Sequence, residues 1–280
     1  MSEPGQAGRA SPSEQRRTQS SGGRELLVVK IGGTTFAEQR GALADVAAVA
    51  ASQDVILVHG GGKRLTEWLE RTGVTSHFVG GLRHTDDAAL EVAVAVLRGI
   101  VNTELVAALR ALGADAVGLS GVDGGLLIAE RVPGLGRVAT VTGARPGTLY
   151  ALLADEKLPV IAPLATDEDG FVCNVNADDV AAGLAGGLGA RLILLTDSDG
   201  VRGADGARIP SLDAEAAERL IGEGVIATGM VPKVRASLRA LEESCPEAVI
   251  ADGSAPAPLS RALDDPSFGT RLRRAAAPAR

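Results

Sequence analysis

Short apolar runs that alternate with longer helical patterns are the feature of this sequence that most limits its fold. The run Leu26–Ile31 is followed by a helical pattern over Ala42–Ala51, and the run Val55–Val58 is followed by a helix that continues through Leu69. Such alternation is typical of α/β proteins, in which helices cover both faces of a largely parallel sheet. We therefore predict an α/β three-layer sandwich around a central, mostly parallel sheet.

The rest of the chain continues this alternation. Apolar residues recur at near-helical spacing over Asp86–Leu112, and Gly113 suits the end of that long helix. Leu126–Arg131 and Arg137–Val141 flank the sequence VPGLG and predict a β-hairpin. Further strands are predicted at Ala116–Leu119, Leu158–Leu164, Leu192–Leu195, Ala248–Ala251 and Gly269–Leu272, and further helices at Leu149–Leu153, Asp178–Leu188, Ala214–Ile221 and Lys233–Glu243.

Glycine-rich turns follow several of the predicted strands. Gly32-Gly33 follows the first strand, Gly60–Gly62 the second, Gly121 the strand at Val117, and Asp197–Gly200 the strand at Leu192. Ligands of open α/β sheets bind beyond the carboxyl ends of the strands. Glycine lets backbone N–H groups approach an oxyanion, and a helix N-terminus favours negative charge. These turns predict an anion site at that edge, although each one alone could serve only as a tight turn.

Composition and missing motifs exclude several classes of protein. The net charge is −7 and only 2% of the residues are aromatic, which argues against a nucleic-acid surface. The sequence has no GxGxxG, GxxxxGK[ST], GxSxG or HExxH motif, and His59, His77 and His84 lack metal-ligand spacing. Cys173 and Cys245 belong to no CxxC pattern, so we expect two free thiols and no metal site.

The first 23 residues differ in composition from the rest of the chain. Residues 1–23 are rich in Ser, Gly, Gln, Pro and Arg and predict a disordered tail. Arg16 and Arg17 are not followed by an apolar region, so we predict no export signal. No apolar stretch is expected to be long enough to span a bilayer, and we expect a cytoplasmic protein. Residues 24–280 then form one folded domain with two lobes.

Ten segments, taken together, resemble the amino acid kinase family and, within it, the acetylglutamate kinases. The resemblance runs from Leu27 to Leu272, with the segments in the family's order and at its approximate spacing. They are VVKIGG, VHGGGKRL, FVGGLRHTD, LRGIVNTELVAAL, AVGLSGVDG, LPVIAPLATDEDG, CNVNADDVAAGLA, LILLTDSDGV, GMVPKV and GTRL.

The resemblance implies a function and an organisation. Acetylglutamate kinases transfer the γ-phosphoryl group of ATP to the side-chain carboxylate of N-acetyl-L-glutamate, which yields an acyl phosphate for arginine biosynthesis. It implies that residues 24–185 form an acyl-substrate lobe and residues 186–280 a lobe for ATP with Mg²⁺. It also implies a homodimer formed through the long helix near Asp86–Leu112.

The resemblance assigns catalytic roles by motif. Lys30 and Lys233 match the two lysines that hold the transferring phosphoryl group, and Asp178 matches the aspartate that positions both. From the residues alone, each lysine could instead be an exposed side chain, and Asp178 could be only a helix cap. A carboxylate acceptor needs no general base, which fits a sequence with no catalytic histidine or serine motif.

Binding roles are assigned in the same way. Arg83 matches the clamp of the substrate α-carboxylate, although it could form only a surface salt bridge. Asn174 matches a substrate-binding asparagine, although it could be a turn residue. Gly61 and Gly62 match backbone donors near the acyl substrate. The matches to nucleotide-binding positions are Gly32, Gly33, Asp197, Ser198, Gly200, Val201 and Gly229.

Two other functions stay open on this sequence. One is a sister kinase that phosphorylates carrier-linked or N-acetylated aminoadipate or glutamate; Gly62 in the HGGG loop favours the acetylated free amino acid instead. The other is a non-catalytic sensor on the same fold, which should lack one of the lysines or the aspartate. Lys63, His84, Thr103 and Ser254 depart from the residues common in the family.

Overall fold

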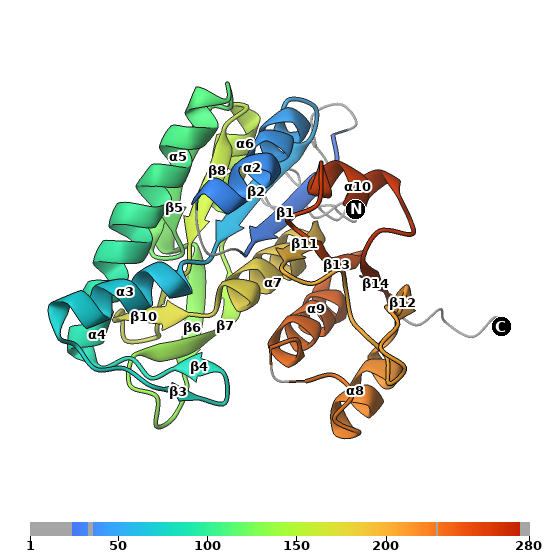
Figure 1. Cartoon of the computed structure of the whole chain (residues 1–280). Helices are drawn as coiled ribbons and strands as arrows, with labels where there is room; N and C mark the ends of the chain where they lie inside the picture. The colour runs from blue at the N-terminus through green and yellow to red at the C-terminus, as the bar shows by residue number, and fades with distance from the viewer. Residues whose placement is uncertain (1–23, 33–35, 228, 275–280) are drawn as a thin grey trace, which may run out of the picture.

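An eight-stranded sheet forms the centre of the computed structural model, which describes residues 24–32, 36–227 and 229–274 (Figure 1). The predicted tail, residues 1–23, lies outside the described residues. Every neighbouring pair of strands in this sheet is parallel except β13 and β14, so the prediction of a mostly parallel sheet is confirmed. In spatial order the strands are β12 (Ser211–Leu212), β14 (Thr270–Leu272), β13 (Ala248–Asp252), β11 (Arg191–Thr196), β1 (Leu26–Ile31), β2 (Asp54–His59), β8 (Leu158–Ala162) and β5 (Ala116–Ser120).

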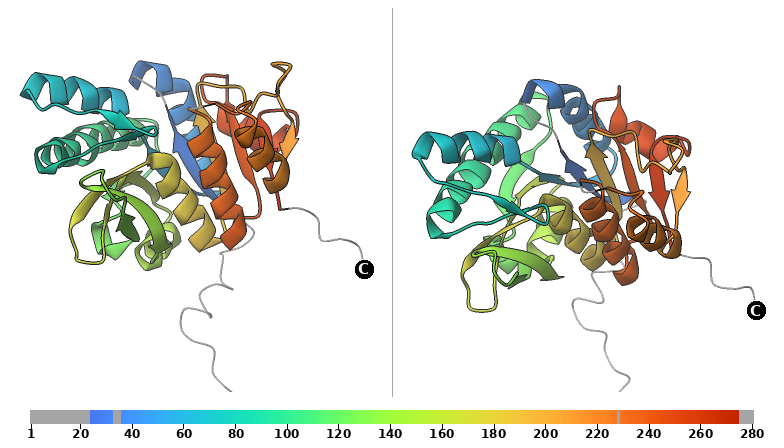
Figure 2. Two further views of the ribbon diagram at one scale, coloured as in Figure 1. Left: turned by 90° about the horizontal axis from the view of Figure 1, so that it is seen from below. Right: turned by 60° about the horizontal axis from the view of Figure 1, so that its bottom comes forward.

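Helices cover both faces of the sheet and so make three layers. One apolar cluster joins the sheet to α2 (Phe36–Ala50), α5 (Asn102–Ala111) and α10 (Pro258–Asp264). A second cluster joins the opposite face to α6 (Gly147–Ala154), α7 (Ala177–Leu188), α8 (Ala214–Gly222) and α9 (Val231–Glu243). Helices α7 and α9 lie side by side (Figure 2). Helix α10 is the one helix of these two layers that the sequence did not predict.

Strand β1 presents alternate side chains to the two layers. Leu27, Val29 and Ile31 pack in the cluster with α2 and α10. Val28 packs in the cluster with α7 and α9. Because side chains alternate along a strand, Lys30 points to the same face as Val28. The period of the strand therefore directs the one charged residue of β1 toward α7 and α9.

A small closed barrel of four strands lies beside the main sheet. It consists of β6 (Leu127–Arg131), β7 (Val138–Ala144), β9 (Leu164–Thr166) and β10 (Val172–Val175). The predicted hairpin is confirmed by the antiparallel pairing of β6 and β7. The prediction of a single strand over Leu158–Leu164 is wrong, because β8 belongs to the sheet and β9 to the barrel. Pro163 lies between them, and a proline has no N–H with which to continue a ladder.

The long helix predicted over Asp86–Leu112 is present but is not uniform. It comprises α4 (Asp87–Ala93), a π-helical segment labelled η2 (Val94–Val101) and α5. The Asp86 side chain caps its start by accepting from the Ala89 N–H at 2.8 Å. A π-helical turn inserts extra backbone into a helix and is frequent at functional sites. Connecting elements near this helix are α3 (Gly62–Thr72), the hairpin β3 (Phe78–Val79) and β4 (Leu82–Arg83), and the short turn η3 (Asp123–Gly125).

This helical stretch is also long and apolar enough, by length and composition alone, to cross a membrane. It spans the 25 residues Asp87–Ala111, with a mean hydropathy of 1.8 in its most apolar window, 39% of which is buried. The prediction that no stretch reaches this length is therefore wrong. Part of the helix packs on β5, as helices of an α/β core do. Core helices of this kind can be as long and as apolar as a helix that spans a membrane.

Candidate active site

Two lysines from opposite ends of the sequence meet at one buried carboxylate. Lys30 Nζ lies 2.9 Å from Asp178 Oδ1, and Lys233 Nζ lies 3.2 Å from Asp178 Oδ2. Only 7% of Lys30 and 3% of Asp178 is exposed, so neither is an exposed surface charge. The structure thus brings together the three residues predicted to be catalytic. We call them the Lys30–Asp178–Lys233 cluster.

Local structure explains how each member of the cluster reaches its place. Lys30 lies near the carboxyl end of β1, on the face toward α7 and α9. Asp178 lies in the first turn of α7, where the Asn176 side chain accepts from the Asp178 N–H at 2.9 Å and caps the helix. Lys233 lies in the first turn of α9, next to Pro232, which suits a helix start.

The charges of the cluster depend on one another. Burial raises the pKa of the Asp178 carboxyl, but the ammonium groups of Lys30 and Lys233 together lower it more. The pKa of Asp178 is therefore below its usual value of 3.8. Asp178 is therefore ionised at neutral pH. Lys233 adds a positive charge to a helix N-terminus, where a cation is normally unfavourable. Such an arrangement is stable when the carboxylate, or a bound anion, offsets it.

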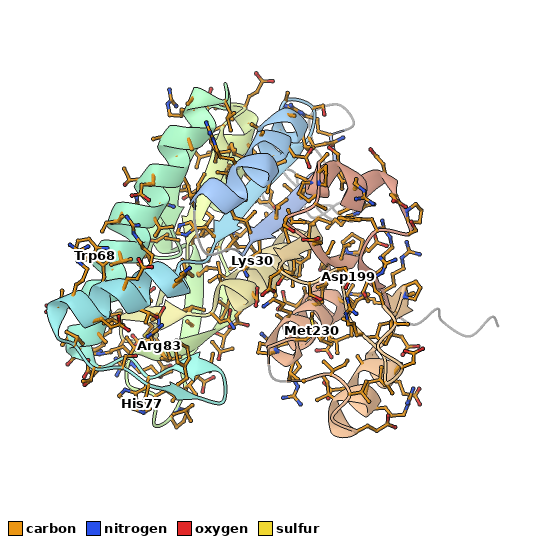
Figure 3. All side chains as sticks on the ribbon, in the orientation of Figure 1. Lys30, Trp68, His77, Arg83, Asp199 and Met230 are labelled. Atoms are coloured by element: carbon orange, nitrogen blue, oxygen red, sulfur yellow. The ribbon has the colours of Figure 1, made fainter. Side chains whose placement is uncertain are left out.

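A cleft of about 460 Å³ opens above the cluster and contains most of the predicted site. Four charged residues are among the described residues that line it: the cations Lys30, Arg83 and Lys233, and the anion Asp178. The predicted residues that line the cleft are Lys30, Gly61, Gly62, Arg83, Asn174, Asp178, Gly229 and Lys233. Lys30 lies near the centre of the molecule, with Arg83 on one side and Met230 on the other (Figure 3).

Three helix N-termini open into this cleft. Gly62 begins α3, Ala177 begins α7, and Pro232 lies in the first turn of α9; all three residues line the cleft. The first N–H groups of a helix have no partner within the helix, and the helix dipole places partial positive charge there. Together with an excess of cations over anions, this arrangement favours the binding of anionic groups.

Arg83 is held at the mouth of the cleft by its neighbours. Its Nη2 donates to Thr66 Oγ1 at 2.6 Å and to the Gly62 carbonyl at 3.3 Å, and its Nη1 donates to Ser76 Oγ at 3.2 Å. The guanidinium also lies over the Phe78 ring, 4.5 Å from its centroid. Partial burial lowers the pKa of Arg83, which remains charged. The interpretation of Arg83 as only a surface salt bridge is not supported, because its partners are neutral.

Two asparagines connect the cleft to the barrel and to α7. Asn174, on β10, donates from Nδ2 to Thr85 Oγ1 at 3.2 Å, and Thr85 in turn donates to the Arg83 carbonyl at 2.9 Å. Asn176 lines the cleft as well and was not predicted, although it belongs to the same NVNAD motif. Other lining residues that the sequence reasoning missed include Phe78, Leu82, Leu97, Pro163 and Pro232.

The predicted nucleotide-binding residues are only partly brought to the cleft. Gly229 lines it, whereas Gly32 does not. The Gly32 N–H donates to the Leu195 carbonyl at 2.8 Å, and a Cβ there would lie 3.0 Å from Lys30 Nζ, so Gly32 provides space beside the lysine. Gly33 lies outside the described residues.

The loop after β11 carries the remaining predicted nucleotide-binding residues: Asp197, Ser198, Gly200 and Val201. Asp197 accepts from Thr196 Oγ1 at 2.9 Å, and Ser198 Oγ donates to the Gly200 carbonyl at 2.7 Å. Val201 is fully buried and its N–H donates to Thr270 Oγ1 at 2.8 Å. Val201 therefore anchors the loop to β14. The nucleotide roles of these residues remain predictions.

A second hollow, of about 470 Å³, lies at the opposite edge of the sheet. Its lining includes Asp54, Asp115, Lys157 and Leu158, which lie at or just before the amino ends of β2, β5 and β8. Ligands of open α/β sheets bind at the carboxyl ends. Lys157 already pairs with Asp115 at 2.6 Å. The cleft above the Lys30–Asp178–Lys233 cluster is therefore the candidate active site.

Comparison with known proteins agrees with this geometry. A sequence model of the amino acid kinase family matches residues 25–252. The chain belongs to the amino acid kinase family. It is 44% identical over 252 residues to acetylglutamate kinase from Solibacter usitatus, with 88% of this chain and 98% of that protein covered. It is 45% identical over 237 residues to acetylglutamate kinase from Methanopyrus kandleri, with 80% and 94% covered.

A solved structure agrees with the family assignment at the level of the fold. N-acetylglutamate synthase from Neisseria gonorrhoeae, solved with coenzyme A and N-acetyl-glutamate, superposes with a TM-score of 0.78 at 23% identity. The match covers 95% of this chain and 62% of that one. At this identity the likeness extends to the fold and not to the activity.

The donor set of this amino acid kinase suits a metal that arrives with its substrate. Within the part of the chain that the structure describes, no group of three or more His, Cys, Asp or Glu side chains is placed to hold a metal ion. Asp178 is already engaged by two ammonium groups. Mg²⁺ commonly binds through one or two carboxylates and through the phosphates of a nucleotide. The residues present therefore fit Mg²⁺ held mainly by nucleotide phosphates.

Proposed function

We propose that this amino acid kinase transfers the γ-phosphoryl group of ATP to the side-chain carboxylate of N-acetyl-L-glutamate. The product is N-acetyl-L-glutamyl 5-phosphate, an intermediate of arginine biosynthesis. The observation that carries the proposal is the Lys30–Asp178–Lys233 cluster at the base of a cleft that also contains Arg83. Curated acetylglutamate kinases at 44–45% identity over most of the chain support it.

The mechanism follows from the charges in the cleft. A carboxylate oxygen attacks the γ-phosphorus, the bond from that phosphorus to the β,γ-bridging oxygen breaks, and ADP leaves. The acceptor is already ionised, so no general base is required. Lys30 and Lys233 stabilise negative charge on the transferring group and reduce the repulsion between two anions. Asp178 holds the two ammonium groups in fixed positions, so they need not reorganise during the reaction.

The acyl substrate has one more anionic group than the reaction uses. In this proposal the guanidinium of Arg83 binds its α-carboxylate, because a planar cation with several N–H donors suits a carboxylate. Gly61 and Gly62 present backbone N–H groups to the substrate, and Asn174 contributes a side-chain amide. All four residues line the same cleft as the cluster, which supports this assignment.

We propose that the carboxyl-terminal part of the chain, residues 186–280, binds the nucleotide. Residues 24–185 then form the lobe that binds the acyl substrate. Asp197, Ser198, Gly200 and Gly229 lie in that part, beyond the carboxyl end of β11 or just before α9. Mg²⁺, bound to the phosphates, neutralises part of their charge when the nucleotide is present. The protein's own contribution is then the lysine pair and the helix N-termini.

We also propose that the enzyme is a homodimer, formed through the long helix Asp87–Ala111. Most of the apolar window of this helix is not buried within the chain, which supports a protein partner for it. A second copy of the chain meets this need without any further protein. The two buried free cysteines and the biosynthetic reaction support a cytoplasmic location.

Hydroxamate formation tests the proposed reaction directly, since hydroxylamine traps acyl phosphates. The purified chain is incubated with ATP, Mg²⁺ and one of four acceptors: N-acetyl-L-glutamate, N-acetyl-2-aminoadipate, L-glutamate or L-aspartate. We expect ATP-dependent product with N-acetyl-L-glutamate at the highest rate. A faster reaction with the aminoadipate derivative would refute the proposed substrate, and no product with any acceptor would refute the proposed reaction.

A further inference from the structure

His59 is the last residue of strand β2, and its side chain contacts Gly60, the first residue of the glycine-rich loop. It is 1% exposed, and its Nδ1 lies 2.6 Å from the Gly60 carbonyl oxygen. A carbonyl oxygen only accepts, so Nδ1 carries the proton. Burial lowers the pKa of His59 to about 4, more than the bond to Gly60 raises it. The neutral ring then has Nε2 free to accept a hydrogen bond.

A residue of the long helix, Asn102, donates a hydrogen bond to His59 Nε2. Asn102, fully buried in the first turn of α5, donates from Nδ2 to His59 Nε2 at 3.1 Å and to the Val160 carbonyl at 2.9 Å. Its Oδ1 accepts from Arg98 Nη1 at 3.2 Å, which fixes the orientation of the amide. A Cβ at Gly118 would overlap Asn102 Oδ1, so this side chain is also packed tightly against β5.

The same helix contacts the loop a second time through its π-helical segment. A Cβ at Gly61 would lie 2.6 Å from Leu97 Cδ2 and 3.6 Å from Val101 Cγ2. Leu97 and Val101 both belong to η2. The glycine-rich loop is therefore held between the polar pair His59–Asn102 and the apolar surface of the π-helical segment.

We propose that His59 is a positioning residue that aims the backbone donor of Gly61 at the acyl substrate, with Asn102 holding its ring. The reason is the planarity of the peptide bond. The Gly60 carbonyl and the Gly61 N–H share one rigid plane and point in opposite directions. A hydrogen bond that fixes the carbonyl therefore fixes the direction of the N–H. Three consecutive glycines have no side chains to impose that direction, so a neighbouring group must do so.

The proposal rests on the proposed function only for the identity of the substrate. A histidine with a purely structural role would affect stability and leave the affinity for both substrates unchanged. A positioning role predicts a selective loss of affinity for the acyl substrate. It also predicts a change in the loop itself, which is measurable without any substrate.

The test compares two variants at this position. In His59→Leu, which removes both hydrogen bonds at similar volume, we expect KM for N-acetyl-L-glutamate to rise about tenfold, the effect of roughly one hydrogen bond. KM for ATP should stay within about twofold. His59→Asn places an amide N–H where Nδ1 was and should recover most of the affinity. Leu43→Ala, a fully buried change in α2, serves as the control for lost stability.

Amide hydrogen exchange without substrates gives the second measurement. In His59→Leu, exchange over Gly60–Leu65 should be faster than in the natural chain, and in Leu43→Ala it should not. The proposal is overturned if KM for N-acetyl-L-glutamate is unchanged, if both KM values rise together, or if exchange over Gly60–Leu65 is unchanged. If the natural chain does not phosphorylate N-acetyl-L-glutamate, the proposed function fails, and hydrogen exchange alone decides the role of His59.

Variants of Asn102 provide an independent test of the proposal that Asn102 holds the His59 ring. Asn102→Leu should raise KM for N-acetyl-L-glutamate in the same direction as His59→Leu. Because both residues act on one loop, the double variant should be no worse in KM than the worse single variant. Multiplied effects in the double variant would show that Asn102 acts apart from His59 and would overturn this part of the proposal.

Discussion

Lys30 Nζ lies 2.9 Å from Asp178 Oδ1, and both side chains are almost completely buried. The carboxylate is shared with Lys233, so one negative charge faces two positive charges. The cluster therefore keeps an excess positive charge away from water. Such an arrangement is costly in an empty site and becomes favourable when a second anion enters, which is what a phosphoryl-transfer site requires.

The first prediction concerns Lys30. Lys30→Met keeps the apolar stem and removes the charge that, in the proposed mechanism, stabilises the transferring group. We expect kcat to fall on the order of 10²-fold or more, as on removal of one electrostatic stabiliser. Steady-state hydroxamate kinetics measure it. Lys157→Met, at the opposite edge of the sheet, should leave kcat unchanged, and an equal loss in both variants would show that Lys30 has no special role.

The second prediction concerns Asp178 and stability. Asp178→Asn leaves the buried ammonium of Lys30 and the partly buried ammonium of Lys233 without their carboxylate. It should lower the free energy of unfolding by about 3 kcal/mol at neutral pH. The pKa of Asp178 is lower in the folded chain than in the unfolded chain. Its stabilising contribution is therefore complete above pH 3.8, the unfolded value, and is lost as the pH falls through the folded value.

Urea unfolding at several pH values measures this difference. The difference in free energy of unfolding between the natural chain and Asp178→Asn should be constant from neutral pH down to about pH 4. It should become smaller below that pH. A gap that widens on acidification would contradict the assigned sign. Asp199→Asn, an exposed residue paired with Arg202, provides the matched control and should show almost no gap.

The third prediction separates two roles for Gly32. If Gly32 provides space, Gly32→Ala should push Lys30 Nζ away, because the new Cβ would lie 3.0 Å from it. We then expect lower kcat with little change in KM for ATP. A rise in KM for ATP at unchanged kcat would instead indicate that Gly32 binds the nucleotide. We do not expect this, because the Gly32 N–H already donates to the Leu195 carbonyl.

The fourth prediction concerns Arg83. Arg83→Ala should raise KM for the acyl substrate and change kcat little, since a clamp contacts ground and transition states alike. Arg83→Lys keeps the charge but loses the fork, and should recover only part of the affinity. A collapse of kcat at constant KM would assign Arg83 to the chemistry. Arg219→Ala, on α8 and paired with Glu223, is the control.

Much of the site could be predicted because its residues follow strands or begin helices. The turn after β2 and the first turns of α7 and α9 carry short motifs whose positions the strand–helix alternation fixes. Lys30 is the clearest example, because a charge in an otherwise apolar strand needs a buried partner. The motif order then supplied Asp178 and Lys233, and the structure places both within 3.2 Å of their partners.

Other features leave no local signal in the sequence. The strand predicted over Leu158–Leu164 divides at Pro163 between two sheets, and both halves are buried, so hydrophobicity does not reveal the break. The β3–β4 hairpin has only two residues in each strand, too few for a period. The π-helical segment keeps apolar spacing close to that of an α-helix. The contacts of His59 depend on Asn102, 43 residues away, which no local pattern could show.

The ratio of kcat/KM for N-acetyl-L-glutamate to that for free L-glutamate is the sharpest test of the proposed substrate. The two acceptors carry the same carboxylates and differ at the α-nitrogen, which is a neutral amide in one and a cation in the other. Among the residues that the structure describes, three cations and one anion line the cleft, so an added ammonium meets repulsion and loses hydration. We predict a ratio on the order of 10² or more. Equal values for the two acceptors would show that the cleft does not select the acetylated amino acid.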